Sequence, residues 1–232
     1  MNHISYSELK EWVHCAFSHK LIRLDKIDGF KGNAFTAFGN AIHNVCEKKL
    51  LKEEINDEEY FLQEFETYLS KLPSDVEVDP KLAEQMRAQG KSLLQEPLIE
   101  NALKEYFKDG YEVLEAEMAL YEPVKGYEDY RFKGYIDGIV ATPDGKVHIF
   151  DWKTCSWGWN ARRKNDAMTT YQLTLYKHFF AQKMDIDPKD IETHFALIKR
   201  TAKKNRVEFF RVSSGPKKTQ NAIKLLDKAL YN

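Results

Sequence analysis

Three side chains that could act together in catalysis lie within residues 131–154: Asp137, Asp151 and Lys153. The triplet Pro-Asp-Gly at 143–145 predicts a tight turn between two strands. Proline presets φ, aspartate hydrogen-bonds its own backbone, and glycine accepts a positive φ. If the strands pair from this turn, Asp137 lies opposite Asp151, with Cα atoms about 5 Å apart. Two carboxylates would then share one face of a hairpin.

The same register places Tyr135 opposite Lys153. Side chains alternate along a strand, so Asp151 and Lys153 should share one face of the sheet. Phe150 and Trp152 should point to the other face. One face of the hairpin is therefore expected to collect two acids and an amine.

Like charges directly opposite each other destabilise a strand pair, so this arrangement needs a compensating charge. A divalent cation supplies one, because Mg²⁺ binds one or two carboxylates and keeps waters for a substrate phosphate. A lysine beside such an ion can steady a nucleophilic water or the transition state. The alternative interpretation is an exposed hairpin with a solvated polar face.

Length and composition fit a soluble globular protein. The chain has 232 residues, of which 43% are hydrophobic and 31% charged, enough to build a real core. No apolar run approaches a membrane span and no secretory leader is visible, which predicts a cytoplasmic protein without a membrane partner. The cysteines Cys15, Cys46 and Cys155 show no C-x-x-C spacing, which argues against disulfides and a closed zinc site.

The charges divide the chain into two unlike parts. Residues 1–145 hold 17 Lys and Arg against 28 Asp and Glu, a balance of −11. Residues 146–232 hold 18 against 8, a balance of +10. A basic half after a carboxylate site suits a polyanionic substrate such as nucleic acid. Alternatively, two oppositely charged surfaces attract each other within the fold.

A helix expected at about residues 35–52 carries a histidine that could join the site. On it, Gly39 and His43 are one turn apart and share a face. Glycine permits close approach of another element, and His43 would point where Gly39 leaves room. The alternative is a core histidine with ordinary hydrogen bonds. Upstream, Ser5 can cap a helix and Glu8, three residues later, can complete a capping box, and this helix is expected to serve packing.

Residues 53–110 have a helical pattern broken by prolines and contain no chemical motif. A strand is expected at 111–121, where acidic and apolar residues alternate. On this strand, Glu117 could add a third acid to the site. Solvation of an edge strand explains Glu117 equally well.

After the hairpin, two tryptophans precede three cations: Trp157, Trp159, Arg162, Arg163 and Lys164. Aromatic faces among basic groups are typical of surfaces that bind single-stranded nucleic acid. A loop anchored by buried tryptophans is the alternative. A second group of cations, in a turn between two strands expected at 193–199 and 207–212, could contact duplex backbone. A terminal helix is expected from about Lys217.

The helix expected at about 166–183 places Gln172 and Tyr176 one turn apart on a common face. An amide and a phenol in that position could reach phosphate oxygens at the mouth of the site. Alone, this Q-x-x-x-Y spacing is a weak signal.

Taken in order, these motifs resemble the RecB-type branch of the PD-(D/E)xK nuclease superfamily. The set consists of I-x-Y-S-x-L-x-x-W-x-x-C from Ile4 to Cys15, G-x-x-x-H at Gly39 and His43, G-x-I-D from Gly134 to Asp137, D-x-K at Asp151 and Lys153, and Q-x-x-x-Y at Gln172 and Tyr176. It covers residues 4 to about 180. The superfamily's proline is replaced by Ile136, which this branch tolerates.

The resemblance implies a role for each matched residue. It makes His43, Asp137, Asp151 and the backbone carbonyl of Trp152 the ligands of Mg²⁺ or Mn²⁺. It makes Asp137, Asp151 and Lys153 catalytic, with the lysine assisting the attacking water. Gln172 and Tyr176 would line the DNA site. Relatives with an iron–sulfur cluster use one early and three late cysteines, and no cysteine follows Cys155, so no cluster is expected.

The resemblance also implies a fold and an activity. The fold would be an α/β, restriction-endonuclease-like core with a mixed central β-sheet flanked by helices, plus an N-terminal helical layer. We expect residues 1–232 to form one nuclease domain with a helical elaboration at about 53–108. The expected activity is a stand-alone, phage-like DNA exonuclease in recombination, repair or replication, with DNA and a recombination or replication protein as partners. The alternatives are a structure- or nick-directed endonuclease and a non-catalytic DNA-binding module.

Overall fold

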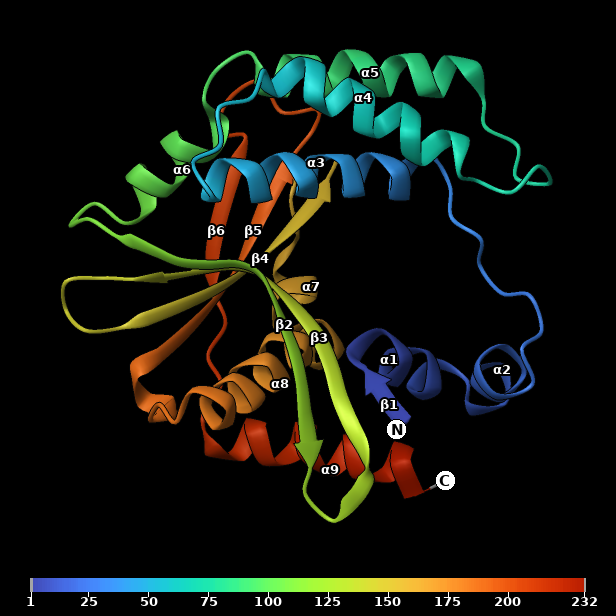
Figure 1. Ribbon diagram of the computed structural model, residues 1–232, viewed down its shortest axis with the longest axis vertical. Coiled ribbons are helices and arrows are strands. Elements are labelled where there is room, and N and C mark those ends of the chain that lie inside the picture. Colours follow the sequence, from blue (N-terminus) through green and yellow to red (C-terminus); the bar gives the residue numbers. More distant parts are fainter. Residues whose placement is uncertain (1, 232) are drawn as a thin grey trace.

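The computed structural model describes residues 2–231, and within that range it contains a mixed six-stranded sheet. The strands are β1 (Asn2–Ser5), β2 (Glu112–Val124), β3 (Tyr127–Ala141), β4 (Val147–Cys155), β5 (Ile191–Lys199) and β6 (Val207–Arg211). Strand β1 is parallel to β3 and β4 is parallel to β5, whereas β2–β3, β3–β4 and β5–β6 are antiparallel. The mixed sheet flanked by helices confirms the expected α/β, restriction-endonuclease-like class (Figure 1).

Helices cover both faces of this sheet. They are α1 (Tyr6–His14), α2 (Ala16–His19), the π-helical turn η1 (Lys20–Leu24), α3 (Ala34–Leu50), α4 (Asp57–Ser70), α5 (Pro80–Leu94), α6 (Leu98–Tyr106), α7 (Ala161–Asn165), α8 (Ala167–Met184), the 3₁₀ turn η2 (Pro188–Asp190) and α9 (Pro216–Tyr231). None of these helices is long and apolar enough to cross a membrane.

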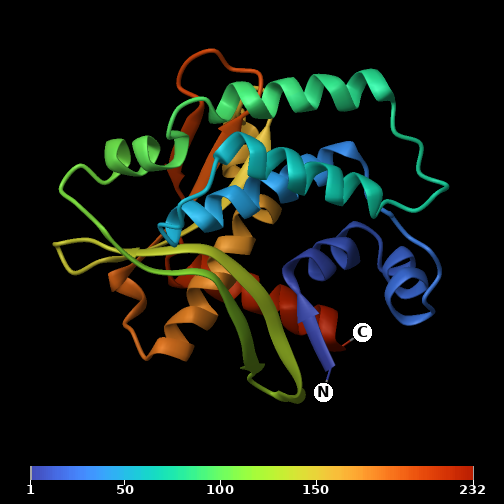
Figure 2. The same cartoon turned by 45° about the horizontal axis from the view of Figure 1, so that its top comes forward.

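Two apolar cores hold the layers together. On one face, α3 lies against the sheet, and α4 and α5 pack on α3 away from the sheet (Figures 1 and 2). Phe150 and Trp152 of β4 belong to this core, so both lie on the face opposite Asp151 and Lys153, as strand alternation predicts. On the other face, α8 and α9 pack against residues such as Ile149 and Phe195. Side chains of β4 and β5 are therefore buried on both faces of the sheet, as is usual for parallel strands between two helical layers.

Strand β3 lies at a fork in the sheet. Along one edge it pairs with β1 at 130–133 and with β4 at 138–141. Between these two stretches, residues 134–137 of β3 have no strand partner on that edge within the described chain. Strand β2 pairs along its other edge. The fork opens the sheet beside Asp137.

The predicted turn and register of the β3–β4 hairpin are confirmed close to the turn. The backbone N–H of Thr142 donates to the carbonyl of Lys146 at 3.0 Å, and Gly145 has a φ of 79°. Pairing then runs from Ala141↔Val147 to Gly138↔Phe150 and ends. The expected backbone pairs Asp137–Asp151 and Tyr135–Lys153 do not form, because the strands separate at the fork.

The N-terminal segment differs from its predicted role. The Ser5 side chain accepts a hydrogen bond from the backbone N–H of Glu8 at 3.2 Å, so the predicted cap is present. The Glu8 carboxylate bonds the His19 ring at 3.1 Å, so it does not complete the expected capping box. Strand β1, which the sequence pattern did not indicate, brings residues 2–5 beside β3.

Candidate metal centre and nucleic-acid surface

Asp137 stands at the point where β3 and β4 separate. Its carboxylate Oδ2 accepts a hydrogen bond from the backbone N–H of Trp152 at 2.7 Å. Because β3 and β4 no longer pair here, the Asp137 carboxylate, and not a backbone carbonyl of β3, accepts the hydrogen bond from this N–H group. The side chain is buried, and its position is coupled directly to the backbone of β4 beside Asp151.

Asp151 is held by two neighbours. Its Oδ1 accepts a hydrogen bond from the Gln172 amide nitrogen at 2.6 Å, and its Oδ2 forms an ion pair with the Lys153 ammonium. The Gln172 amide also reaches Tyr176 Oη at 3.4 Å. The face shared by Asp151 and Lys153, predicted from strand alternation, is therefore present, and α8 supplies its hydrogen-bonding partners.

Gly134 is required by the packing of Tyr176. A Cβ added at Gly134 would lie 2.8 Å from Tyr176 Cε1, which is closer than real Cβ contacts. The glycine of G-x-I-D thus lets α8 approach the unpaired part of β3. Gly39 has a similar role on α3, where an added Cβ would lie 3.3 Å from Thr154 Oγ1.

His43 projects from α3 toward the fork, as its spacing from Gly39 predicts. Its Nδ1 lies 3.6 Å from Asp137 Oδ2, and its ring makes a hydrogen bond to the backbone of Trp152. A helix on one face of the sheet and a strand at its fork therefore place an imidazole, a carboxylate and a backbone carbonyl together.

Glu117 completes a cluster with His43 and Asp137. In the β2–β3 register Glu117 falls between Ala116↔Gly138 and Met118↔Ile136, directly across from Asp137. Its φ is 51°, a left-handed conformation that is uncommon for a residue with a Cβ. One ligand atom from each of Glu117, His43 and Asp137 lies within 4.8 Å of the others.

Burial dominates the electrostatics of this cluster. Desolvation raises the pKa of Asp137 and of Asp151 to about 6, against the lowering effect of the Lys153 ammonium. Burial, with Asp137 nearby, raises the pKa of Glu117 to about 7. Burial and the charge of Lys153 lower the pKa of His43 to about 4, so its imidazole is neutral at pH 7.

The donor set fits a divalent cation. Three carboxyl groups that are buried or half-buried lie close to one another, and the Lys153 ammonium forms an ion pair with one of them, Asp151. A hard dication takes carboxylate and carbonyl oxygens, and a neutral imidazole adds one nitrogen ligand. The cluster also borders open space: a cleft of about 550 Å³ is lined by Asp137, Asp151 and Lys153.

The cleft has contributors that the sequence reasoning missed. Tyr6, Ser7 and Lys10, on the N-terminal helix that was expected to serve packing alone, line it together with Gln172 and Tyr176 of α8. Tyr6 Oη is buried with no hydrogen-bond partner within residues 2–231. The only sequence signal for this contribution was the Y-S pair in the N-terminal motif.

The two tryptophans after β4 have different environments. Trp157 is 75% exposed, whereas Trp159 is buried against Phe195 with ring centroids 5.1 Å apart. The Arg163 guanidinium lies 4.2 Å from the centroid of Trp159. One tryptophan is thus available for stacking, and the other anchors the loop.

The three cations of this loop also differ. Arg162 and Arg163 are exposed on α7, whereas Lys164 forms an ion pair with Glu208 of β6. In the β5–β6 turn, Arg200 bonds Gln89 at 2.7 Å and Arg206 bonds the Ser92 carbonyl. Part of the basic surface expected from the sequence is therefore used inside the protein.

Nearly the whole chain matches a known protein family, although individual similar proteins are distant or not found. The search of curated proteins gave no match. The solved structure described as "Crystal structure of SSO0001" is similar to this chain, with 15% sequence identity and a TM-score of 0.38 over 97% of this chain and 84% of that chain. A family model for the PD-(D/E)XK nuclease superfamily matches residues 3–229, which include the whole cleft. The chain therefore belongs to the PD-(D/E)XK nuclease superfamily.

Proposed function

We propose that this chain is a Mg²⁺- or Mn²⁺-dependent deoxyribonuclease of the RecB-type branch, with residues 1–232 as a single nuclease domain. The observation that carries the proposal is that Asp137, Asp151 and Lys153 line one open cleft, with His43 of α3 behind them, 3.6 Å from Asp137. Nucleases of this superfamily use divalent metal, and the donor set fits such an ion.

The proposed ligands are His43 Nδ1, the carboxylates of Asp137 and Asp151, and the backbone carbonyl of Trp152, with Glu117 as a further carboxylate. When bound, the ion supplies positive charge to a phosphate oxygen and acidifies a water. An imidazole among the ligands favours Mn²⁺ at least as well as Mg²⁺, because nitrogen is the softer donor. No iron–sulfur cluster is included in this proposal.

Lys153 and Gln172 have distinct proposed roles around Asp151. The Lys153 ammonium, held by its ion pair, can orient the attacking water and balance charge on the phosphate. Gln172 acts as a positioning residue, because its amide fixes Asp151 Oδ1. Tyr176 and Gln172 remain proposed contacts for DNA, since both side chains line the cleft.

For the substrate, we propose the end of a DNA duplex, which makes the enzyme an exonuclease. The exposed Trp157 offers a face on which an unpaired terminal base can stack, and Arg162 and Arg163 offer phosphate contacts. A phage-type role in recombination, repair or replication, with a recombination or replication protein as partner, is part of this proposal and rests on the resemblance. A structure-directed endonuclease of the same fold is the second candidate.

The test compares end-labelled linear DNA with closed circular DNA, each with Mg²⁺, Mn²⁺ or EDTA. An exonuclease degrades only the linear DNA and only with metal, whereas cleavage of the circle identifies the endonuclease. Asp151→Asn should lower the rate by about 10²–10⁴-fold while DNA binding is kept or improved. Asp129→Asn, exposed on the same β3 strand as Asp137, is the matched control and should cleave normally. Equal activity in EDTA, or an Asp151→Asn variant above about a tenth of the wild-type rate, would overturn the proposal.

A further inference from the structure

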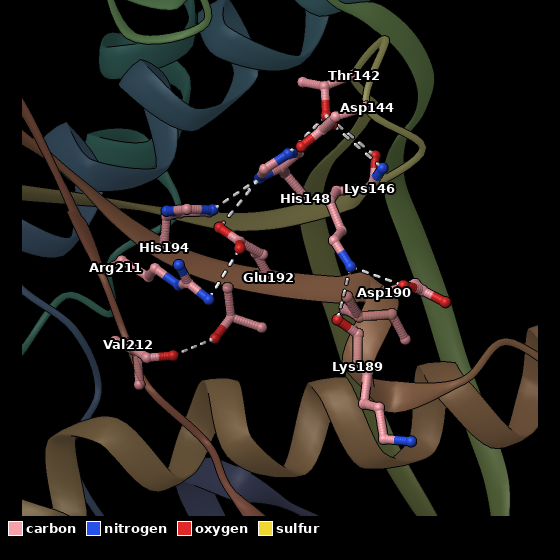
Figure 3. A network of polar contacts seen from close by, with 12 residues as sticks. Thr142, Asp144, Lys146, His148, Lys189, Asp190, Glu192, His194, Arg211 and Val212 are labelled. Carbon is pink, nitrogen blue, oxygen red and sulfur yellow. Dashed lines mark hydrogen bonds and ion pairs between the residues drawn. The ribbon is translucent and has the colours of Figure 1, made fainter.

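A second group of metal-ligating side chains lies on β4 and β5, away from the cleft: His148, Glu192 and His194. The parallel register pairs His148 with Glu192, and His194 follows two residues later on β5. All three therefore face the same side of the sheet. Figure 3 shows the three side chains converging, with Arg211 beside Glu192. The end of α6 covers them, because the Phe107 ring packs 5.0 Å from the His148 ring.

The separations between the donor atoms suit a small cation. His148 Nδ1 lies 3.0 Å from His194 Nε2 and 3.9 Å from Glu192 Oε2, and one ligand atom from each residue lies within 4.8 Å of the others. In a tetrahedral zinc site, with bonds of about 2.0–2.1 Å, neighbouring donors are about 3.3 Å apart. Small side-chain rotations would bring these three donors to that spacing.

In each proposed ligand, the nitrogen or oxygen atom that points away from the cluster already has a hydrogen-bonding or ion-pair partner. His148 Nε2 lies 2.9 Å from Thr142 Oγ1, which donates its proton to Asp144 Oδ1 at 2.5 Å. His148 Nε2 must therefore be the donor to Thr142, and Nδ1 keeps its lone pair toward the cluster. Partners of this kind, on the far nitrogen, orient the histidines of protein metal sites.

The other two ligands have comparable partners. His194 Nδ1 lies 3.0 Å from Tyr106 Oη, so its Nε2 faces the cluster. Glu192 Oε1 forms an ion pair with the Arg211 guanidinium at 2.8 Å, which leaves Oε2 directed toward His148. Burial lowers the pKa of both histidines, that of His194 to about 3, which keeps the imidazoles in the neutral form that binds metal.

The cluster also has a consistent metal-free state. Tyr106 can donate to His194, His194 to His148, and His148 to Thr142. In that state Glu192 Oε2, 3.9 Å from His148 Nδ1, is too far from that ring for a hydrogen bond. When a cation binds, the His194 proton moves from Nε2 to Nδ1 and points to Tyr106 Oη, so no proton has to leave the protein.

We propose that His148, Glu192 and His194 form a second metal site that binds Zn²⁺, or a similar ion such as Co²⁺, with water as the fourth ligand. Two imidazoles and one carboxylate suit such ions better than Mg²⁺. The site is separate from the cleft, because His148 is three residues from Asp151, about 10 Å along β4, and on the opposite face. A bound ion would tie α6, the β3–β4 turn and β5 together and stabilise the fold.

The test measures Zn²⁺ binding in a protein that also carries Asp137→Asn and Asp151→Asn, so that the cleft loses its carboxylates. This background should bind one equivalent of Zn²⁺. At a Zn²⁺ concentration 100 times Kd, its Tm should rise by about 5–10 °C. Bound Co²⁺ should give the visible absorption of a tetrahedral site. None of these readouts depends on nuclease activity, so a failure here is distinct from a failure of the proposed nuclease function.

When added separately to this background, the substitutions His148→Gln and Glu192→Gln should each abolish Zn²⁺ binding. The second variant keeps the size of the side chain and its contact with Arg211, and should fold even if the first does not. Asp190→Asn, which removes the nearby partner of Lys146, is the matched control and should retain the equivalent of Zn²⁺. Binding below about a fifth of an equivalent in the background, or full binding by Glu192→Gln, would overturn the site.

Discussion

Asp137→Asn should stabilise the metal-free protein while it abolishes cleavage. The Asp137 carboxyl is buried, and desolvation is the largest influence on its pKa, which rises from 3.8 to about 6. At pH 8 the ionised group then destabilises the fold by up to about 3 kcal/mol, since one pKa unit corresponds to about 1.36 kcal/mol. Asparagine has no charge, and its amide oxygen can still accept the hydrogen bond from the Trp152 N–H.

The sign of the pH dependence follows from the raised pKa. The folded protein holds the Asp137 proton more tightly than the unfolded chain, so wild-type stability falls as pH rises from about 4 to about 7. The advantage of Asp137→Asn should therefore be about 1 kcal/mol at pH 4.5 and at most about 3 kcal/mol at pH 8. For a chain of this size, a gain of about 1–3 kcal/mol raises Tm by about 2–12 °C.

The assay is thermal unfolding in EDTA at both pH values, followed by a titration with Mg²⁺ at pH 8. Mg²⁺ should raise the Tm of the wild type, because binding favours the folded state, and should have little effect on Asp137→Asn. Asp129→Asn controls for the loss of an exposed carboxylate on the same strand. A variant no more stable than the wild type at pH 8 would refute the reasoning, because Asp137 would then not be a destabilised buried charge.

Three further predictions concern the metal and the DNA surface. His43→Ala should lose activity at limiting metal and regain part of it as metal concentration rises, because loss of a ligand is a binding defect; unchanged metal dependence with a lower Tm would make His43 a core residue. The affinity for Mg²⁺, measured as the Tm shift, should weaken from pH 8 to pH 6, because Glu117 and Asp137 must release protons whose pKa values are about 7 and 6. An affinity independent of pH would contradict this. Neutralising Arg162 and Arg163 together should reduce the salt dependence of DNA binding by up to about 2 in the log–log slope, and an unchanged slope would leave them as a solvated surface.

The β3–β4 hairpin could be predicted because its determinants are local. Pro143, Asp144 and Gly145 specify the turn, and the turn sets the register of the strands that follow. The alternation that assigns Phe150 and Trp152 to one face also needs no information from the rest of the chain. The helix spacing of Gly39 and His43 is local in the same way, although the target of His43 is not.

The fork in the sheet could not be predicted, because it depends on a pairing between distant parts of the chain. Strand β1 has only four residues, and its partner at 130–133 lies more than a hundred positions later. Without β1, nothing indicates where β3 changes partner or that β4 must leave it at Gly138. The same limit applies to Glu117, whose alternation pattern suits an edge strand and a metal centre equally well. Its left-handed backbone opposite Asp137 is visible only in the folded protein.

The basic C-terminal half shows why the charge of a segment is not the charge of a surface. The surplus of cations after residue 145 predicted a polyanion-binding region, with attraction between the two halves of the chain as the alternative. In the structure three of these cations have partners inside the protein: Lys164 is paired with Glu208 of the same half, and Arg200 and Arg206 bond Gln89 and Ser92 of α5. These three cations are engaged within the fold, so they cannot contribute full phosphate contacts without breaking bonds that position the strands. The salt dependence of DNA binding should therefore depend more on exposed cations such as Arg162 than on the sum of positive charges in the sequence.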